Sequence, residues 1–202
     1  MNYISNTLLE YHISNGVECI KKGGILLHPT DTVWGLACDI NNDLAIEKII
    51  RIKNIDLKNR NGFILVVNSI FMLKNYVTEL NSDAIDILNN ITEPTTIVYE
   101  GGRNCSKYLL GKDNTIAIRL IRDDKNNDLL KLLNKIIDTL KSPFLSTSAN
   151  ISGQKTPQEL DEVAIEIKNS VDYIIDLDIK GTGKPSKIIK LLTNGEIITI
   201  RE

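Results

Sequence analysis

The apolar residues of this chain fall into short blocks of two kinds, which alternate irregularly along the sequence. Some blocks are continuous apolar runs bounded by Gly, Pro or Asn, which is typical of buried strands. Others repeat apolar residues at a spacing near 3.6, which is typical of helices packed on one face. Such alternation, with crossovers and one hairpin, predicts an α/β (α+β) fold with a mostly open mixed β-sheet and flanking helices.

The two patterns place the elements along the chain. Strands are expected at residues 24–28, 33–38, 62–67, 95–99, 115–121, 144–148, 173–177, 187–192 and 196–201. Helices are expected after a cap at residues 6–7, after a cap at residues 42–43, near residues 69–76 and 82–90, at 128–140, and at 157–168, where a proline takes the first helical position. The Thr-Asn-Gly turn at residues 193–195 joins the last two strands as a hairpin.

Length and charge limit the classes of function. A chain of 202 residues is expected to form a single domain over 1–202. Its 24 Lys and Arg residues against 26 Asp and Glu residues give a net charge of -2. No general positive field would therefore hold a nucleic acid, and any basic site must be local.

The chain is poor in the side chains of many catalytic sites. Cys19, Cys38 and Cys105 are far apart and form no Cys-x-x-Cys pair, so they are expected to be reduced packing thiols. With only His12 and His28, a histidine-rich metal site is excluded and a His-based triad has few candidates. The apolar runs are too short to cross a membrane, and the N-terminal segment does not resemble a signal peptide. We expect a mature cytoplasmic protein with no membrane contact.

Three predicted strands end next to clusters of small polar residues, at 29–32 (Pro-Thr-Asp-Thr), 146–150 (Ser-Thr-Ser-Ala-Asn) and 185–186 (Pro-Ser). In open α/β sheets ligands collect beyond the carboxyl ends of strands, so these clusters predict a binding site. Each cluster taken singly is also explained by local turns and helix caps.

Arg119 is one of six arginines and lies inside an apolar strand. A guanidinium in such a place needs an anionic partner. A carboxylate ligand fits, and so does an internal Asp or Glu. Arg201, near the end of the last predicted strand, is also explained as a solvated terminus.

Three cations, Lys53, Lys58 and Arg60, lie around a polar loop between a helix and a strand. Such a loop either binds phosphates or is simply solvated. The stretch Gly-Thr-Gly-Lys-Pro-Ser at 181–186 fails as a phosphate loop because proline takes the hydroxyl position and a strand follows it. Nucleotide binding would therefore use another fold.

Five blocks together resemble the YrdC-like family of threonylcarbamoyl-AMP synthases, in family order and over nearly the whole chain. The blocks are GILLHPTDTVWGLACD (24–39), Ala45 with IIRIK (49–53), Ala117-Ile-Arg119, STSANISG (146–153) and Pro185-Ser186. The chain resembles the single-domain form of that family. The resemblance implies a twisted sheet around a large concave, positively lined cavity.

The activity implied by the resemblance is that of a nucleotidyltransferase, an L-threonylcarbamoyladenylate synthase. It would condense L-threonine, bicarbonate and ATP to threonylcarbamoyl-AMP and pyrophosphate. This is the first step in making N6-threonylcarbamoyladenosine in tRNA. The attacking carbamate is already an anion, so no Ser, Cys or His nucleophile is needed. Mg²⁺ is expected to arrive with ATP, with no metal site on the protein and no bound organic cofactor.

The resemblance also implies residue roles. Threonine would be held by Thr32, Arg119 and Ser186. The nucleotide would be contacted by Lys58, Arg60, Asn61, Thr115, Ser148, Asn150 and Arg201. Charge on the phosphates would be stabilised by Lys53, Lys58 and Arg60. The family's Lys-x-Arg is Lys53-Asn-Ile55 here, which leaves Lys58 or Arg60 to replace the missing guanidinium.

Partners and alternatives follow from the same resemblance. The product is expected to pass to the tRNA threonylcarbamoyl transferase complex, with at most a weak contact to RNA. One alternative is a non-catalytic RNA-binding module of the same fold, and another is a carbamoyl-transfer relative with a different acceptor.

Overall fold

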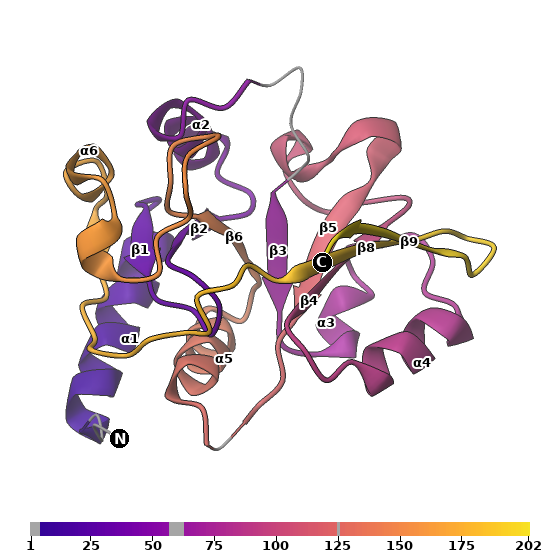
Figure 1. Ribbon diagram of the computed structural model, residues 1–202, viewed down its shortest axis with the longest axis horizontal. Helices are drawn as coiled ribbons and strands as arrows, with labels where there is room; N and C mark the ends of the chain where they lie inside the picture. Colours follow the sequence, from indigo (N-terminus) through magenta and orange to yellow (C-terminus); the bar gives the residue numbers. More distant parts are fainter. Residues whose placement is uncertain (1–4, 57–62, 125) are drawn as a thin grey trace.

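The computed structural model describes residues 5–56, 63–124 and 126–202, and its strands form one nine-stranded sheet (Figure 1). The spatial order of the strands is β7-β1-β2-β6-β3-β5-β4-β8-β9. The strands span Leu26–His28 (β1), Gly35–Asp39 (β2), Ile64–Val67 (β3), Thr95–Tyr99 (β4), Ile116–Leu120 (β5), Phe144–Ser148 (β6), Tyr173–Ile174 (β7), Lys187–Leu191 (β8) and Ile197–Arg201 (β9).

Six α-helices and three short 3₁₀-helices connect the strands in the described part of the chain. The α-helices span Asn6–Lys21 (α1), Asp43–Ile52 (α2), Ile70–Leu73 (α3), Ser82–Asn90 (α4), Asp128–Leu140 (α5) and Ile165–Lys168 (α6). The 3₁₀-helices span Lys107–Leu109 (η1), Lys112–Asn114 (η2) and Leu160–Glu162 (η3). No described helix combines the length and the apolar character that crossing a bilayer requires.

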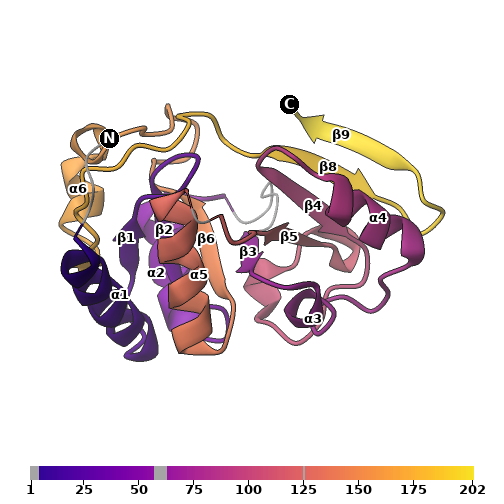
Figure 2. The same cartoon turned by 90° about the horizontal axis from the view of Figure 1, so that it is seen from below.

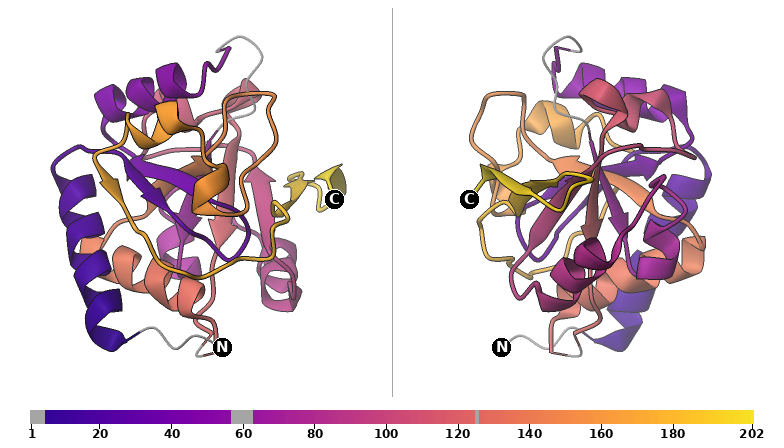
Figure 3. Two further views of the ribbon diagram at one scale, coloured as in Figure 1. Left: turned by 60° about the vertical axis from the view of Figure 1, so that its left-hand side comes forward. Right: turned by 90° about the vertical axis from the view of Figure 1, so that its right-hand side faces the viewer.

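The sheet is mixed and twisted, as Figure 3 shows, which confirms the predicted fold class. β6 pairs antiparallel with both β2 and β3, whereas β3 pairs parallel with β5. The register places Ser148 opposite Gly35 and Ser146 opposite Ile64. Strands from the first and last thirds of the chain are therefore neighbours, which brings distant sequence blocks onto one surface.

Helices cover both faces of the sheet because alternate strand residues point to opposite sides. Leu26, Val66 and Phe144 pack in one cluster with α1 and α5, which lie side by side (Figure 2). Leu27 and Leu65 point the other way, into a second and larger cluster that includes buried residues of α2.

Local capping explains where two of the helices begin. Asn42 caps α2 as predicted, and its side-chain oxygen accepts the N–H of Ala45 at 3.1 Å. α1 is instead capped by Ser5, whose hydroxyl oxygen accepts the N–H of Leu8 at 3.2 Å, one residue before the predicted cap.

The predicted helix over 157–168 is wrong. Only η3 and α6 form there, with Val163 and Ala164 extended between them. The carbonyl of Pro157 accepts the N–H of Trp34 at 3.1 Å, and the N–H of Gln158 donates to the carboxylate of Glu162 at 2.7 Å. The first contact takes a carbonyl that a continuous helix would use, whereas the N–H of Gln158 would have no partner within a helix. The predicted strand at 173–177 is also shorter, because β7 pairs only with the short β1.

Candidate functional site

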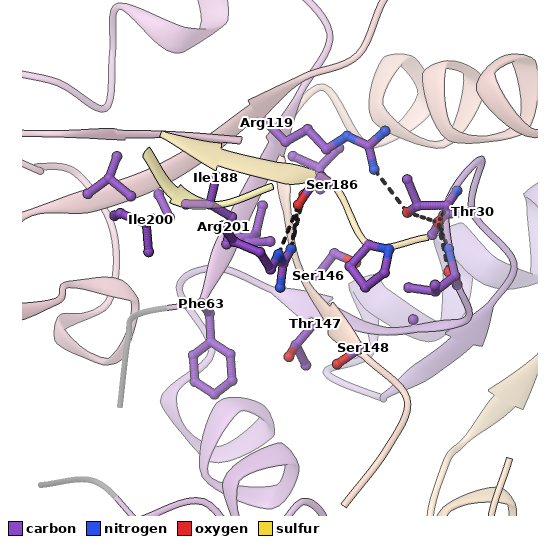
Figure 4. A pocket seen from close by; sticks show the side chains of 18 of the residues that line it. Thr30, Phe63, Arg119, Ser146, Thr147, Ser148, Ser186, Ile188, Ile200 and Arg201 are labelled. Carbon is purple, nitrogen blue, oxygen red and sulfur yellow. Dashed lines mark hydrogen bonds between the residues drawn. The ribbon is translucent and has the colours of Figure 1, made fainter. Parts of the chain in front are cut away.

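A cavity of about 430 Å³ lies on the sheet face that also packs against α5. Small residues at positions that face the cavity, such as Gly35, Ala117 and Ser146, leave this volume open. On β6 the alternate residues Phe144, Ser146 and Ser148 all line it. Figure 4 shows side chains from β5, β6, β8 and β9 converging on this space. Its size suits a small-molecule site.

The bend after β1 is fixed by the hydroxyl of Thr30. This oxygen accepts the backbone N–H groups of Thr32 and Val33 at 3.0 and 3.1 Å and donates to the carbonyl of Val33 at 2.7 Å. It also lies 2.8 Å from the hydroxyl of Thr32. The network holds the buried Thr32 side chain in the cavity wall.

Arg119 reaches from β5 to this bend. Its guanidinium pairs with Asp31 at 2.6 Å and donates to the hydroxyl of Thr32 at 3.3 Å. Arg119 and Asp31 are only 10% and 9% exposed. The structure thus supplies the internal carboxylate partner, and because Arg119 also lines the cavity, a ligand carboxylate stays a prediction. A guanidinium has five N–H donors, so a ligand carboxylate can still be bound there.

A second loop, which leads to Pro185 and Ser186 of the cavity wall, packs against the Thr30–Thr32 bend. The N–H groups of Thr182 and Gly183 donate to the carbonyls of Asp31 and Thr32 at 2.9 and 2.8 Å. A Cβ at Gly181 would lie 2.4 Å from the carbonyl oxygen of Thr30, so glycine is required for this close approach. The glycine-rich stretch therefore packs against a neighbouring turn.

Ser186 follows the same loop, just before β8, and is buried in the cavity wall. Its hydroxyl lies 2.8 Å from that of Thr96. Arg201, on β9, donates from Nε and a terminal nitrogen to the carbonyl of Ser186 at 3.0 and 2.6 Å. The last strand is thereby tied to the cavity wall (Figure 4).

Lys53 lies behind the loop after β6. Its ammonium donates to the carbonyl oxygens of Ser148 and Asn150, at 2.7 Å in the second case, and to the side-chain oxygen of Asn150 at 3.3 Å. The hydroxyl of Ser148 donates to the same Asn150 oxygen at 2.5 Å. Burial lowers the pKa of Lys53 to about 8. Lys53 and Asn150 therefore orient Ser148, while Ser148 itself lines the cavity.

The structure brings six of the predicted site residues to one cavity wall. They are Thr32, Thr115, Arg119, Ser148, Ser186 and Arg201. Lys53 and Asn150 support the wall from behind, whereas Lys58, Arg60 and Asn61 lie outside the described residues. Among those described, no group of three or more His, Cys, Asp or Glu side chains could hold a metal ion.

Several cavity residues had no predicted role, among them His28, Ile188, Lys190 and Ile200. The alternation of strand side chains could have found Lys190, which lies two residues after Ile188 on β8. His28 could have been found from its place at the end of a buried strand.

Comparisons with known proteins agree with this architecture. A family model described as telomere recombination, named for Sua5, YciO and YrdC, matches residues 18–202. A Pseudoalteromonas translucida protein named threonylcarbamoyl-AMP synthase is 30% identical over 188 residues, or 92% of this chain and 95% of that protein. The crystal structure of E. coli YciO has a TM-score of 0.76 at 26% identity, covering 96% of this chain and 89% of its own.

Two structures of Sua5 from P. abyssi have the same fold. A doubly substituted form gives a TM-score of 0.82 at 24% identity over 95% of this chain. The form complexed with L-threonine gives 0.78 at 23% identity, also over 95% of this chain. The chain spans 56% and 54% of those two chains, so it matches about half of that longer protein.

Proposed function

Because the chain belongs to the Sua5/YciO/YrdC family, we propose that it is an L-threonylcarbamoyladenylate synthase, which makes threonylcarbamoyl-AMP and pyrophosphate from L-threonine, bicarbonate and ATP. The observation that carries the proposal is one cavity whose wall holds the buried guanidinium of Arg119, the Thr32 hydroxyl 3.3 Å from it, and the hydroxyl of Ser186. A cation flanked by hydroxyls suits an amino acid's carboxylate.

The chemistry needs positioning more than a protein nucleophile. The amine of threonine joins bicarbonate with loss of water, and the resulting carbamate oxygen attacks the α-phosphorus of ATP as pyrophosphate leaves. Arg119 would bind the carboxylate of threonine, and Thr32 and Ser186 would orient it. Holding both substrates in one cavity supplies the proximity on which such a reaction depends.

The nucleotide is proposed to lie against the wall formed by Thr115, Ser148 and Arg201, with Lys53 and Asn150 orienting Ser148 from behind. Lys58, Arg60 and Asn61 keep their predicted role beside the phosphates. Mg²⁺ is proposed to enter as the ion bound to ATP and to offset the charge of the phosphates.

The relatives support this assignment. The P. translucida protein carries the name of this activity, and the structure of P. abyssi Sua5 was determined with L-threonine. We further propose that the product passes to the tRNA threonylcarbamoyl transferase complex, with only weak contact to RNA. The three free cysteines suit a reducing compartment, and we propose the cytoplasm.

The test is release of pyrophosphate from ATP by the purified protein with Mg²⁺, bicarbonate and each amino acid in turn. We expect release that depends on both L-threonine and bicarbonate, with threonylcarbamoyl-AMP as the product. Absence of that release, together with RNA affinity that falls steeply with salt, would instead indicate an RNA-binding module. Transfer of a carbamoyl group to another acceptor would indicate the carbamoyl-transfer alternative.

A further inference from the structure

His28 carries a ring nitrogen with no partner in the wall of the cavity. The residue ends β1, is only 1% exposed and lines the cavity. Its Nδ1 lies 3.1 Å from the carbonyl oxygen of Pro29, so Nδ1 carries the proton and donates it. Nε2 then keeps its lone pair, and it is buried with no hydrogen-bond donor among the described residues. An acceptor left in this state indicates a donor that arrives with a ligand.

Gly35 lies directly beside Nε2 and has no side chain that would cover the ring on the cavity side. Gly35 of β2 pairs with His28 in the sheet register. A Cβ at Gly35 would lie 3.1 Å from both the Nε2 of His28 and the hydroxyl oxygen of Ser146. A methyl group there would therefore press on both the imidazole acceptor and the hydroxyl, and we name the part of the cavity wall formed by His28, Gly35 and Ser146 the His28 notch.

The imidazole is held in place and uncharged. Phe144 packs against it edge to face, with ring centroids 5.7 Å apart and an interplanar angle of 89°. Burial lowers the pKa of His28 to about 4. At neutral pH the ring is therefore a fixed acceptor at Nε2.

We infer that the His28 notch receives the side-chain hydroxyl of the substrate amino acid, which donates its hydrogen bond to Nε2 of His28. The inference rests on the proposed function and adds the residue that selects a hydroxyl. Arg119 is suited to the carboxylate, and the amine must stay open to bicarbonate and the nucleotide. The hydroxyl is the remaining donor of threonine.

This subsite would distinguish threonine from valine, which has the same shape but carries a methyl group in place of the hydroxyl. Seating that methyl group against Nε2 would leave the buried acceptor unpaired. Sites built to bind a hydroxyl reject such analogues for this reason.

The test compares the calorimetric Kd values of L-threonine and L-valine in the wild-type protein and in His28→Phe, which keeps a flat ring but removes the acceptor. We expect His28→Phe to weaken threonine binding by about 10-fold, to leave valine binding nearly unchanged, and to leave the Kd of ATP unchanged. The matched control is His12→Phe. His12 lies on α1, where its Nδ1 lies 3.0 Å from the Tyr173 hydroxyl, so this variant should preserve the threonine to valine ratio.

A second variant tests the space itself. Gly35→Ala places a methyl group in the notch, against two side chains. We expect it to weaken threonine binding by about 10-fold or more without changing the Kd of ATP. It decides the question if His28→Phe does not fold, because unchanged threonine binding in Gly35→Ala would overturn the inference.

Two further outcomes would overturn the assignment of the hydroxyl. One is threonine binding in folded His28→Phe that is unchanged from the wild type. The other is an equal loss for both amino acids, which would place the amine at Nε2. Failure of the proposed function is distinguishable from failure of this inference. If the proposed function is wrong, the wild-type protein will not release pyrophosphate when threonine is added.

Discussion

Arg119 and Asp31 form a buried ion pair that joins the middle of the sheet to the bend beside the cavity. Such a pair contributes little net stability, but removing one partner leaves an uncompensated buried charge. The same guanidinium is available to a substrate, so folding and binding depend on one side chain.

For Arg119→Ala we therefore expect two separate losses. Threonine-dependent pyrophosphate release disappears, and the free energy of unfolding falls by about 3–5 kcal/mol because Asp31 remains buried without its partner. Urea unfolding measures the stability change. Adding Asp31→Asn should restore much of the stability and none of the activity. Wild-type-like release with unchanged threonine affinity in Arg119→Ala would contradict the assigned role.

His28 links stability to pH. Its folded pKa of about 4 lies below the ordinary histidine pKa of 6.5, so the unfolded chain binds more protons between these values. The contribution is present above pH 6.5 and is lost as the pH falls toward 4, by about 3 kcal/mol. Urea unfolding at pH 7 and pH 4.5 should show a smaller acid loss in His28→Phe than in the wild type. Equal losses in both proteins would show that His28 does not titrate in this way.

At the scale of elements, the bend between β1 and β2 depends on one hydroxyl. Thr30→Val removes the acceptor for the N–H groups of Thr32 and Val33, which remain buried. We expect a loss of about 2 kcal/mol or more in unfolding free energy and weaker threonine binding, because Thr32 loses its support.

The matched control for this change is Thr139→Val on α5. Its hydroxyl donates to the carbonyl of Lys135 at 2.7 Å on an exposed surface. The expected loss there is below about 0.5 kcal/mol in the same urea experiment. Equal losses for the two variants would mean that the Thr30 network does not stabilise the bend.

Helices and strands were predictable from the sequence where they are determined by nearby residues. α5 was predicted with its observed bounds because its apolar spacing is regular and Asn127 caps it. The segment at 157–168 has a proline in a helical first position, yet its backbone is bound by Trp34, a residue more than a hundred positions away. The helix propensity of nearby residues gives no information about a hydrogen bond from so distant a residue.

The site was predictable to a similar extent. The polar clusters were expected to converge at strand ends, and Thr32, Ser148 and Ser186 do line one cavity, although Ser186 lies just before β8 and does not follow a strand. The partner of Arg119 was not predictable, because any of 26 acidic residues could have supplied it. The contacts of Lys53 were likewise not predictable from the sequence, because they are made to backbone carbonyls about a hundred residues away in the chain.

At the scale of the whole molecule, β9 is peripheral to the sheet but belongs to the cavity. Among the described strands it pairs only with β8, and its residues are all exposed. Deleting residues 193–202 should therefore lower the Tm by only about 4 °C. Pyrophosphate release should be lost, because Arg201 no longer supports Ser186.

Thermal unfolding and the pyrophosphate assay check these two expectations, with Arg201→Ala as the smaller change. A truncated chain that remains folded and fully active would exclude β9 from the site.

The interleaved strand order also has a consequence for synthesis on the ribosome. β1 and β2 are made early, yet their outer neighbours β7 and β6 emerge only after residues 174 and 148. The nascent chain therefore exposes unpaired, apolar strand edges for most of translation, when they are open to aggregation. Pairing across such sequence distances is also slow. We expect the yield of folded protein to depend on temperature and chaperones more steeply than that of an equally stable helical bundle.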